Sequence, residues 1–173
     1  MEKIPLEIVI PIYNEGDKVI KLLDQFQTFI KTQFRVLLCY DLEGDNIFNY
    51  KDSFKKFNFK VLLVKNPSKG PCSAVKAGFC YGNSDCVIVY PADDFLNIKI
   101  IDQMYISFKN NNDVVVASRF MKGGSMKGCP IIKSVLVRIA SSTLYLLSSI
   151  PVKDASNGFR LFSRKLLNTV NVE

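Results

Sequence analysis

Five short apolar runs alternate with segments whose apolar residues recur at helical spacing, and this pattern constrains the fold most. The runs are 6–12, 34–40, 60–65, 86–90 and 113–118. Helices are predicted over 15–31, 51–57, 71–80, 98–110 and 130–149, and a short final strand or turn over 158–163. Because strand and helix alternate without internal repeats, we expect an α/β fold with a mostly parallel sheet covered on both faces by helices.

The composition is typical of a soluble globular protein of one domain. The chain has 173 residues, of which 48% are hydrophobic and 23% charged, and this suits one core. The most apolar stretch, 131–152, contains Lys133, Arg138 and several serines, so we expect no membrane span. The first ten residues carry acids and lack a small-residue cleavage site, which argues against a signal peptide. We expect a single domain over 1–173, complete or shortened at its C-terminus, in the cytoplasm or at the cytoplasmic face of a membrane.

Three features of the composition exclude classes of function. There is no histidine, which excludes His-based triads and makes oxygen atoms the expected ligands of any metal. The five cysteines show no CxxC spacing, so reduced, mostly buried thiols are expected. The net charge is +7, but Lys and Arg are scattered and no nucleic-acid motif occurs. We therefore expect no nucleic-acid partner, although such a surface also attracts phosphorylated substrates or anionic lipids.

Polar residues lie at or just after the ends of all five apolar runs. They are Tyr13-Asn14-Glu15, Tyr40-Asp41, Asn66, Asp93-Asp94 and Ser118-Arg119. In open α/β sheets, ligands bind at the edge where the carboxyl ends of the parallel strands meet. Since all five strand ends are polar, the sequence predicts a functional site at that edge.

The adjacent acids Asp93 and Asp94 suggest what this site binds. Two neighbouring carboxylates repel each other unless another charge offsets theirs. A Mg²⁺ or Mn²⁺ ion would do so by binding carboxylate oxygens on one side and diphosphate oxygens on the other. The same ion would stabilise a departing nucleoside diphosphate. The alternative is that Asp93 caps the following helix and Asp94 is solvated.

Three further segments are candidates for phosphate binding. NPSKGPCSAVKAG (66–78) is a turn that opens a helix, but it matches neither the P-loop nor the Rossmann pattern. SRFMKGG (118–124) places Arg119 at a strand end, where it could bind phosphate bidentately or form a surface salt bridge. DASNGFRLFSR (154–164) carries Asp154 and Arg160, which could serve the site or form an internal ion pair.

Taken in order, these motifs resemble those of family-2 glycosyltransferases. VIPIYNE, the Asp41 region, NPSKGPCSAVKAGF, PADD, ASRFMKGG and DASNGFRLFSR follow the family's order over nearly the whole chain. The nearest branch is the dolichol-phosphate mannose synthase-like group of polyprenyl-phosphate sugar transferases. The resemblance implies a GT-A fold, which is a Rossmann-like nucleotide-sugar-binding domain, and the use of Mg²⁺ or Mn²⁺.

The resemblance assigns a first set of positions to the nucleotide sugar. They are Pro11, Tyr13, Asn14, Glu15, Asp41, Asn66 and Asp93. Asp41 matches the acid that contacts the base or ribose, and Asp45 matches a later acid of the same loop. Asp93 matches the last acid of a DxD-like metal motif, and Asp94 would assist it as a second metal ligand.

A second set is assigned to the acceptor, namely Arg119, Lys133, Arg138 and Arg160. Arg119 matches the arginine after the fifth strand that faces phosphate groups. Asp154 and Arg160 match the DxxxGFR segment on the acceptor side. The resemblance thus implies Asp93, Asp94, Arg119 and Asp154 as the catalytic residues.

Four positions depart from the family's pattern. Tyr40 stands where the family has the first acid of a pair, and Pro91 replaces the first acid of the DxD-like motif. Lys133 and Val137 occupy the places of an Arg and a Ser that bind an acceptor phosphate, and lysine lacks the fork geometry of arginine. The acceptor site therefore departs further from the family than the donor site.

The expected function is an inverting, metal-dependent glycosyltransferase that uses a GDP- or UDP-linked sugar. The acceptor would be a polyprenyl phosphate, which is already ionised, or a growing glycan, whose hydroxyl needs a carboxylate base such as Asp154. A nucleotidyltransferase is a second possibility, but its Gly-rich N-terminal loop is absent. A third is a catalytically weak nucleotide-sugar-binding or scaffold module.

The predicted helix over 130–149 has apolar residues on more than one face. Two explanations are open: the helix is buried in the core, or one face rests on a membrane as a peripheral contact.

Overall fold

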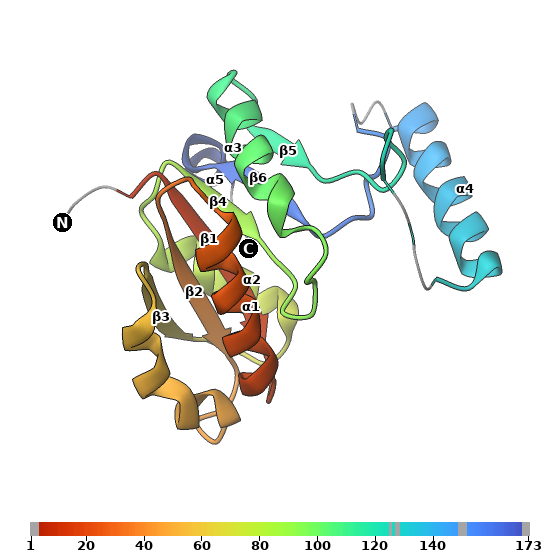
Figure 1. Ribbon diagram of the computed structural model, residues 1–173. Helices are drawn as coiled ribbons and strands as arrows, with labels where there is room; N and C mark the ends of the chain where they lie inside the picture. The colour runs from red at the N-terminus through yellow and green to blue at the C-terminus, as the bar shows by residue number, and fades with distance from the viewer. Residues whose placement is uncertain (1–3, 125, 127–128, 149–151, 171–173) are drawn as a thin grey trace.

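A six-stranded sheet forms the centre of the molecule in the computed structural model, which describes residues 4–124, 126, 129–148 and 152–170 (Figure 1). The strands are β1 (Leu6–Ile12), β2 (Phe34–Tyr40), β3 (Lys60–Lys65), β4 (Cys86–Val89), β5 (Val114–Val116) and β6 (Arg160–Ser163). Their order in the sheet is β3-β2-β1-β4-β6-β5. β1 to β4 are mutually parallel, and only β6 runs antiparallel to its neighbours β4 and β5. The predicted mostly parallel α/β sheet is thus confirmed.

Helices cover both faces of the sheet. One face packs against α1 (Gly16–Phe29), η1 (Asn46–Lys56), η2 (Ile98–Ile100) and α3 (Ile101–Lys109). The other packs against α2 (Pro71–Tyr81) and α5 (Arg164–Thr169). Alternate residues of β1 point to opposite faces, so Ile8 and Ile10 meet the first layer and Val9 meets the second.

Close packing of α2 explains its small residues. A Cβ atom added at Gly78 would lie 2.5 Å from a methyl carbon of Val9 on β1. Ala74 and Ala77 are buried beside it. The helix therefore approaches the sheet closely and positions the turn before it, Asn66 to Gly70, at the carboxyl end of β3.

A buried ion cluster joins β1, β2 and α5, and the sequence interpretation missed it. Glu7 lies inside an apolar run, and its side chain is fully buried. One carboxylate oxygen accepts from Arg35 Nε at 2.7 Å. The other accepts from Ser84 Oγ at 2.7 Å and Arg164 Nη2 at 2.8 Å. Because every charge has a partner, the strand tolerates an acid in the core.

The 3-10 helix η1 begins at Asn46, earlier than the predicted helix over 51–57. Asp45 is the N-cap of η1, because its side chain accepts a hydrogen bond from Ile47 N at 2.9 Å. The helix α5 was not predicted, and Ser163 caps it in the same manner. The expectation of mostly buried thiols is wrong for Cys72 and Cys80, which are exposed.

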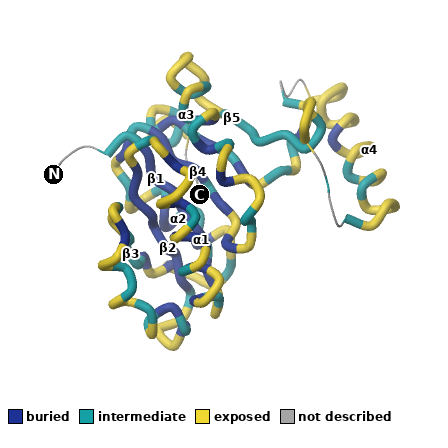
Figure 2. Tube along the Cα trace, in the orientation of Figure 1, coloured by how far each residue is buried: buried dark blue, intermediate teal, exposed yellow. Residues whose placement is uncertain are grey.

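The helix α4 (Ile131–Leu147) lies apart from the sheet and its other helices, as Figures 1 and 2 show. Ser141 is its one buried residue. Leu146 and Leu147 are 76% and 81% exposed, and Ile131 is 83% exposed. Burial in the core, one of the two explanations of its apolar residues, is therefore wrong. No helix in the described part of the chain is both long and apolar enough to cross a membrane.

Candidate functional site

The carboxyl ends of β1 to β5 meet at one edge of the sheet, because β5 runs in the same direction as the four parallel strands. The segments that follow these strands carry the predicted site residues. Pro11 lies within β1 and is half-buried, whereas Tyr13 just beyond it is 58% exposed. Glu15 precedes α1 and pairs with Lys18 at 3.3 Å.

Asn14 is locked between β1 and the loop after β2. Its backbone has a positive φ of 54°, a conformation that asparagine tolerates better than most residues. Its N–H donates to Asp45 Oδ2 at 2.8 Å. Asn46 Nδ2 donates to the Asn14 carbonyl at 3.1 Å, and Asn46 Oδ1 accepts from Gly16 N at 2.8 Å. The turn is therefore organised before any ligand binds. The resemblance gave Asp45 only as a later acid of this loop, and Asn46 had no role in the sequence interpretation. The asparagines and aspartates around Gly44 were the available signal for a structured turn.

Asp41 and Asn66 form a second organised unit, at the ends of β2 and β3. Asn66 Nδ2 donates to Asp41 Oδ1, and Gly70 N donates to Asp41 Oδ2 at 3.0 Å. Both oxygens of Asp41 are thus engaged within the protein. Asn66 is 5% exposed, and its Oδ1 atom has no hydrogen-bond partner among the described residues. An unpaired buried oxygen is costly, so this carbonyl is an acceptor ready for a donor group.

The two acids after β4 have different surroundings. Asp94 Oδ1 accepts from Leu96 N and Asn97 N at 2.9 and 3.0 Å, and its Oδ2 accepts from Asn97 Nδ2 at 2.7 Å. Asp93 is exposed, and no described residue hydrogen-bonds to its carboxylate. The turn after β4 is therefore held by Asp94, and Asp93 is the carboxylate that remains free.

The oxygen ligands at this edge fit a divalent cation whose remaining coordination positions are filled by substrate. No group of three or more Asp, Glu, Cys or His residues within the described ranges lies close enough to hold a metal by itself. Mg²⁺ commonly binds one or two carboxylates together with substrate phosphates and water. Asp93, with its free oxygens, meets that requirement. Asp94 could add only lone pairs that its turn leaves unused.

Arg119, after β5, is held by Asp154. Its Nε and Nη2 donate to the two carboxylate oxygens at 2.9 and 2.6 Å, and its backbone N–H donates at 2.8 Å. Burial alone raises the pKa of Asp154, but hydrogen bonds from the Arg119 side chain and backbone outweigh it and lower that pKa below its ordinary value. The hydrogen bonds that Arg119 donates to Asp154 likewise raise the pKa of Arg119. An internal pair between Asp154 and Arg160 is not formed.

Arg160 serves its own loop instead. Its Nε donates to the Asn157 carbonyl at 2.6 Å, and its Nη2 donates to the Ala155 carbonyl. These bonds shape the turn before β6, so in this structure the guanidinium group stabilises the loop around Asp154.

A cavity of about 650 Å³ lies between α3 and the segment that follows β5. Its polar lining includes Asp94, Asn97, Arg119 and Lys122, and Met104 and Phe159 are among its apolar residues. The cavity thus connects the turn after β4 with the Arg119 loop.

The basic residues of α4 are placed differently from each other. Arg138 Cζ lies 5.2 Å from the centre of the Phe120 ring, and Arg119 Cζ lies 5.5 Å from the same centre. Lys133 is exposed. The structure thus brings Arg138, but not Lys133, to the ring beside Arg119. Phe120 had no role in the sequence interpretation, although an aromatic residue next to a strand-end arginine was a possible signal.

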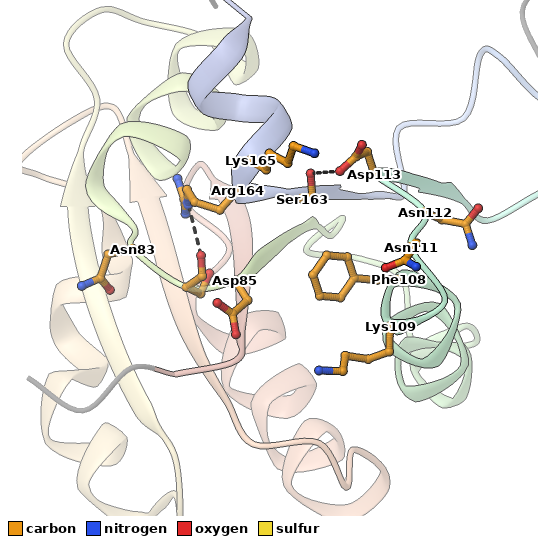
Figure 3. A pocket seen from close by; sticks show the side chains of 11 residues that line it. Asn83, Asp85, Phe108, Lys109, Asn111, Asn112, Asp113, Ser163, Arg164 and Lys165 are labelled. Carbon is orange, nitrogen blue, oxygen red and sulfur yellow. Dashed lines mark hydrogen bonds between the residues drawn. The ribbon is translucent and has the colours of Figure 1, made fainter.

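A second hollow, of about 630 Å³, lies at the opposite edge of the sheet (Figure 3). Its lining comes from the starts of β4 and β5, the end of α3 and the start of α5. Asp85 and Asp113 face it together with Lys109 and Lys165, so charges of both signs are present. None of the predicted site residues lies there.

Comparison with protein families identifies the chain. A family model described as glycosyl transferase family 2 matches residues 7–170. The chain belongs to this family. Relatives include a dolichol-phosphate mannosyltransferase of Pyrococcus furiosus, 23% identical over 96% of this chain and 48% of that protein. A dolichyl-phosphate β-glucosyltransferase of Trichomonas vaginalis, ALG5A, is 24% identical over 92% of this chain and 53% of that protein.

These names support the dolichol-phosphate mannose synthase-like branch predicted from the motifs. The family-2 chain spans about half the length of these curated relatives.

Solved structures show that the fold is GT-A. Glucosyl-3-phosphoglycerate synthase from Mycobacterium tuberculosis, solved with Mn²⁺ and UDP, matches with a TM-score of 0.68 and 15% identity, over 96% of this chain and 59% of that one. The mannosyltransferase PcManGT from Pyrobaculum calidifontis, solved with GDP-Man and Mn²⁺, has a TM-score of 0.59 and 15% identity, over 98% and 47%. The GT-A fold expected from the motifs is confirmed.

Proposed function

We propose that this family-2 chain is an inverting, metal-dependent glycosyltransferase that moves a sugar from a GDP- or UDP-linked donor to a polyprenyl phosphate. One observation carries the proposal: a free carboxylate, an unpaired buried amide oxygen and a fixed arginine all lie at the carboxyl edge of a GT-A sheet. They belong to Asp93, Asn66 and Arg119. The curated relatives named for dolichol-phosphate sugar transfer support the choice of acceptor.

The nucleotide would bind over β1 to β3. Asn66 Oδ1 would accept a hydrogen bond from the base or ribose, and Asp41 orients that amide by accepting from its Nδ2. Pro11, Tyr13, Asn14 and Glu15 would line the pocket along the end of β1. Because the Asn14 turn is already held by Asp45 and Asn46, little order would be lost on binding.

The diphosphate would lie between Asp93 and Arg119. A Mg²⁺ or Mn²⁺ ion held by Asp93 would, when bound, neutralise the negative charge of the departing nucleoside diphosphate. Asp94 holds the turn that presents Asp93. Two solved structures with the same fold contain Mn²⁺ together with UDP or GDP-Man, which supports a metal here.

The acceptor would attack the anomeric carbon on the face opposite the diphosphate. A new bond forms from the acceptor oxygen, and the bond from the anomeric carbon to the diphosphate oxygen breaks, so the configuration inverts. Phosphate is already ionised, so this step needs no protein base. Arg119 would face that phosphate, and Lys133, Arg138 and Arg160 would be the further basic residues of the acceptor side.

The exposed helix α4 supports contact with a membrane, where a polyprenyl phosphate would reside. Its exposed apolar residues include Ile131, Leu146 and Leu147, and Lys133 and Arg138 lie on the same helix. Apolar side chains can enter the interface while basic ones meet lipid phosphates. We therefore infer a peripheral position at the cytoplasmic face of a membrane.

A second candidate is a nucleotide-sugar-binding module with weak or no turnover. The observation that favours it is the state of the acids after β4, where Pro91 replaces one acid and Asp94 is engaged in the turn. Only one fully free carboxylate would then hold the metal.

Thermal shift measurements against nucleoside diphosphates and sugar nucleotides, with and without Mn²⁺, test both candidates when combined with a transfer assay to farnesyl phosphate. A metal-dependent shift with transfer supports the enzyme. A metal-dependent shift without hydrolysis or transfer supports the binding module. The absence of any shift contradicts both.

A further inference from the structure

Asp154 is the one carboxylate that the sequence offered as a general base, but its surroundings suit a different task. Its side chain is 0% exposed. Both oxygens accept hydrogen bonds from Arg119, and Ser156 Oγ adds a longer contact at 3.5 Å. A base must present a lone pair to the substrate hydroxyl, and this carboxylate presents its lone pairs to an arginine.

We propose that Asp154 is a positioning residue for Arg119 and not a proton acceptor, and that Phe120 couples Arg119 to Arg138, so that two guanidinium groups face one anionic acceptor. This inference rests on the proposed glycosyltransferase function. It extends that function by excluding acceptors that need Asp154 as a base.

The side-chain N–H groups of Arg119 show which hydrogen-bond donors remain for a substrate. Arginine has five side-chain N–H groups. Nε and Nη2 donate to Asp154, and Nη2 also donates to Ser156 Oγ at 2.8 Å. Nη1 makes no hydrogen bond within the described ranges, and the Arg119 side chain is 28% exposed. Asp154 and Ser156 therefore hold one edge of the guanidinium group and leave the Nη1 donors for an anion.

The charge balance of the pair agrees with this arrangement. Asp154 pairs with Arg119 inside the protein, and the Arg119 hydrogen bonds lower the pKa of Asp154 against the effect of burial. A carboxylate with a lowered pKa is a weak base. Its contribution is then to fix the direction in which Arg119 points.

Phe120 brings in the second guanidinium group. The Cζ atoms of Arg119 and Arg138 both lie within 5.5 Å of its ring centre. Aromatic rings attract cations at this range, whereas two like charges near one ring repel each other. A phosphate between the two groups would offset that repulsion. Since Ser141 is the one buried residue of α4, the contact of Arg138 with Phe120 helps to place this otherwise exposed helix beside Arg119.

The first experiment measures binding of farnesyl phosphate to the full chain, with neither donor nor metal present, and uses farnesol as the uncharged probe. Asp154→Asn and Arg119→Gln should each weaken farnesyl phosphate binding by about tenfold, and the double variant should be no weaker than Arg119→Gln, since coupled residues are not additive. Asp113→Asn is the matched control, because it removes a carboxylate at the other end of β5 and should leave affinity unchanged.

A separate kinetic readout distinguishes positioning from base catalysis. If Asp154 positions Arg119, Asp154→Asn raises the KM for farnesyl phosphate and leaves kcat within about threefold, whereas loss of a general base lowers kcat by roughly 10²–10⁴. Unchanged affinity with lost kcat, or independent effects of Asp154→Asn and Arg119→Gln, would overturn the inference. So would equal binding of farnesol, which would show that the apolar chain alone is recognised.

Two milder variants keep the test valid where Asp154→Asn fails to fold. Ser156→Ala removes an exposed acceptor from Arg119 Nη2 and should weaken farnesyl phosphate binding by about twofold to threefold. Phe120→Leu should weaken it further, and Phe120→Tyr, which keeps the ring, should restore it. Phe29→Leu is the control for Phe120→Leu, since Phe29 contacts the amine of Lys99 in another part of the chain. Unchanged binding in both Ser156→Ala and Phe120→Leu would contradict the inference.

Failure of the proposed function gives a different result. A chain that neither binds nor hydrolyses any sugar nucleotide, yet shows this pattern with farnesyl phosphate, would refute the glycosyltransferase and retain the two-arginine site. A chain that transfers sugar but lacks this pattern with farnesyl phosphate would support the glycosyltransferase and refute the two-arginine site.

Discussion

The two halves of the candidate site are built differently. The half proposed to bind the donor (the donor half), residues 4–112, rests on β1 to β4 and on helices that cover both faces of the sheet. Its Asn14 and Asp41 turns are held by hydrogen bonds that join separate loops. The segment proposed to bind the acceptor (the acceptor arm), residues 117–148, carries Arg119 and α4, and most α4 side chains are exposed (Figure 2). The donor half is thus organised by the chain itself, whereas the acceptor arm has surface left for a further partner.

Burial explains this difference. Apolar side chains stabilise a fold when they leave water, at roughly 25 cal/mol per Å². In the donor half, α1 buries Val19, Leu22 and Phe26 completely. In α4 the comparable residues remain in water, and a large exposed apolar patch marks an interaction site. Mutations in the two regions should therefore affect different properties of the protein.

The largest expected effect is on stability, in the donor half. Glu7→Ala leaves Arg35 buried at 3% exposure without its carboxylate, and loss of one partner of a buried pair costs about 3–5 kcal/mol. Urea unfolding followed by circular dichroism measures this change. Glu43→Ala, whose pair with Lys65 is at the surface, is the matched control and should cost less than about 1 kcal/mol. Equally small changes in Glu7→Ala and Glu43→Ala would mean that the buried cluster contributes little to stability.

The second effect is on catalysis, at the junction of the two regions. Asp93→Asn should reduce kcat by roughly 10²–10³ because it removes the carboxylate proposed to hold the metal, and metal stabilisation is worth several kcal/mol. Stability should not change, since Asp93 is exposed. Asp94→Asn should reduce kcat less and loosen the turn after β4. Metal titrations of donor hydrolysis provide the measurement. Unchanged metal dependence in Asp93→Asn would remove it from the metal site.

A smaller effect is expected at the basic residues of α4. Arg138→Ala should raise the acceptor KM by about tenfold and Lys133→Ala should raise it less, and both should leave hydrolysis of the donor by water nearly unchanged. Arg138 should matter more, because it alone of the two contacts Phe120. Steady-state kinetics with farnesyl phosphate measures both constants. Loss of donor binding in both variants, or a neutral sugar as the preferred acceptor, would contradict the assignment.

The smallest effect on stability is expected at the apolar surface of α4. Replacing both Leu146 and Leu147 by Asp should change the free energy of unfolding by less than about 0.5 kcal/mol, as is usual for surface sites. The same variant should no longer float with vesicles of anionic lipids. Ile106→Asp, at a 60% exposed position on α3, is the control and should float like the unchanged protein. Flotation that survives the double change would exclude α4 as the membrane contact.

Much of the fold could be read from the sequence. The bounds of β1, β2 and β3 agree with the predicted apolar runs, because strands buried on both faces need continuous apolar residues. The end of each run then placed Asn14, Asp41, Asn66, Asp93 and Arg119 at a common edge. Periodicity predicted only the later part of η1, as a helix over 51–57, and it missed α5, which has 6 residues. Both elements begin with capping side chains, from Asp45 and Ser163.

The sequence by itself determined the sheet, its carboxyl edge and the kinds of polar residue gathered there, since these follow from local hydrophobic period and strand direction. Only the tertiary structure decided which acid is free, because Asp94, rather than Asp93, faces the N–H groups of its turn. It also decided that Asp154 pairs with Arg119 and not with Arg160. These outcomes depend on contacts between residues far apart in the chain, or on the direction of a single side chain, and neither leaves a periodic trace in the sequence.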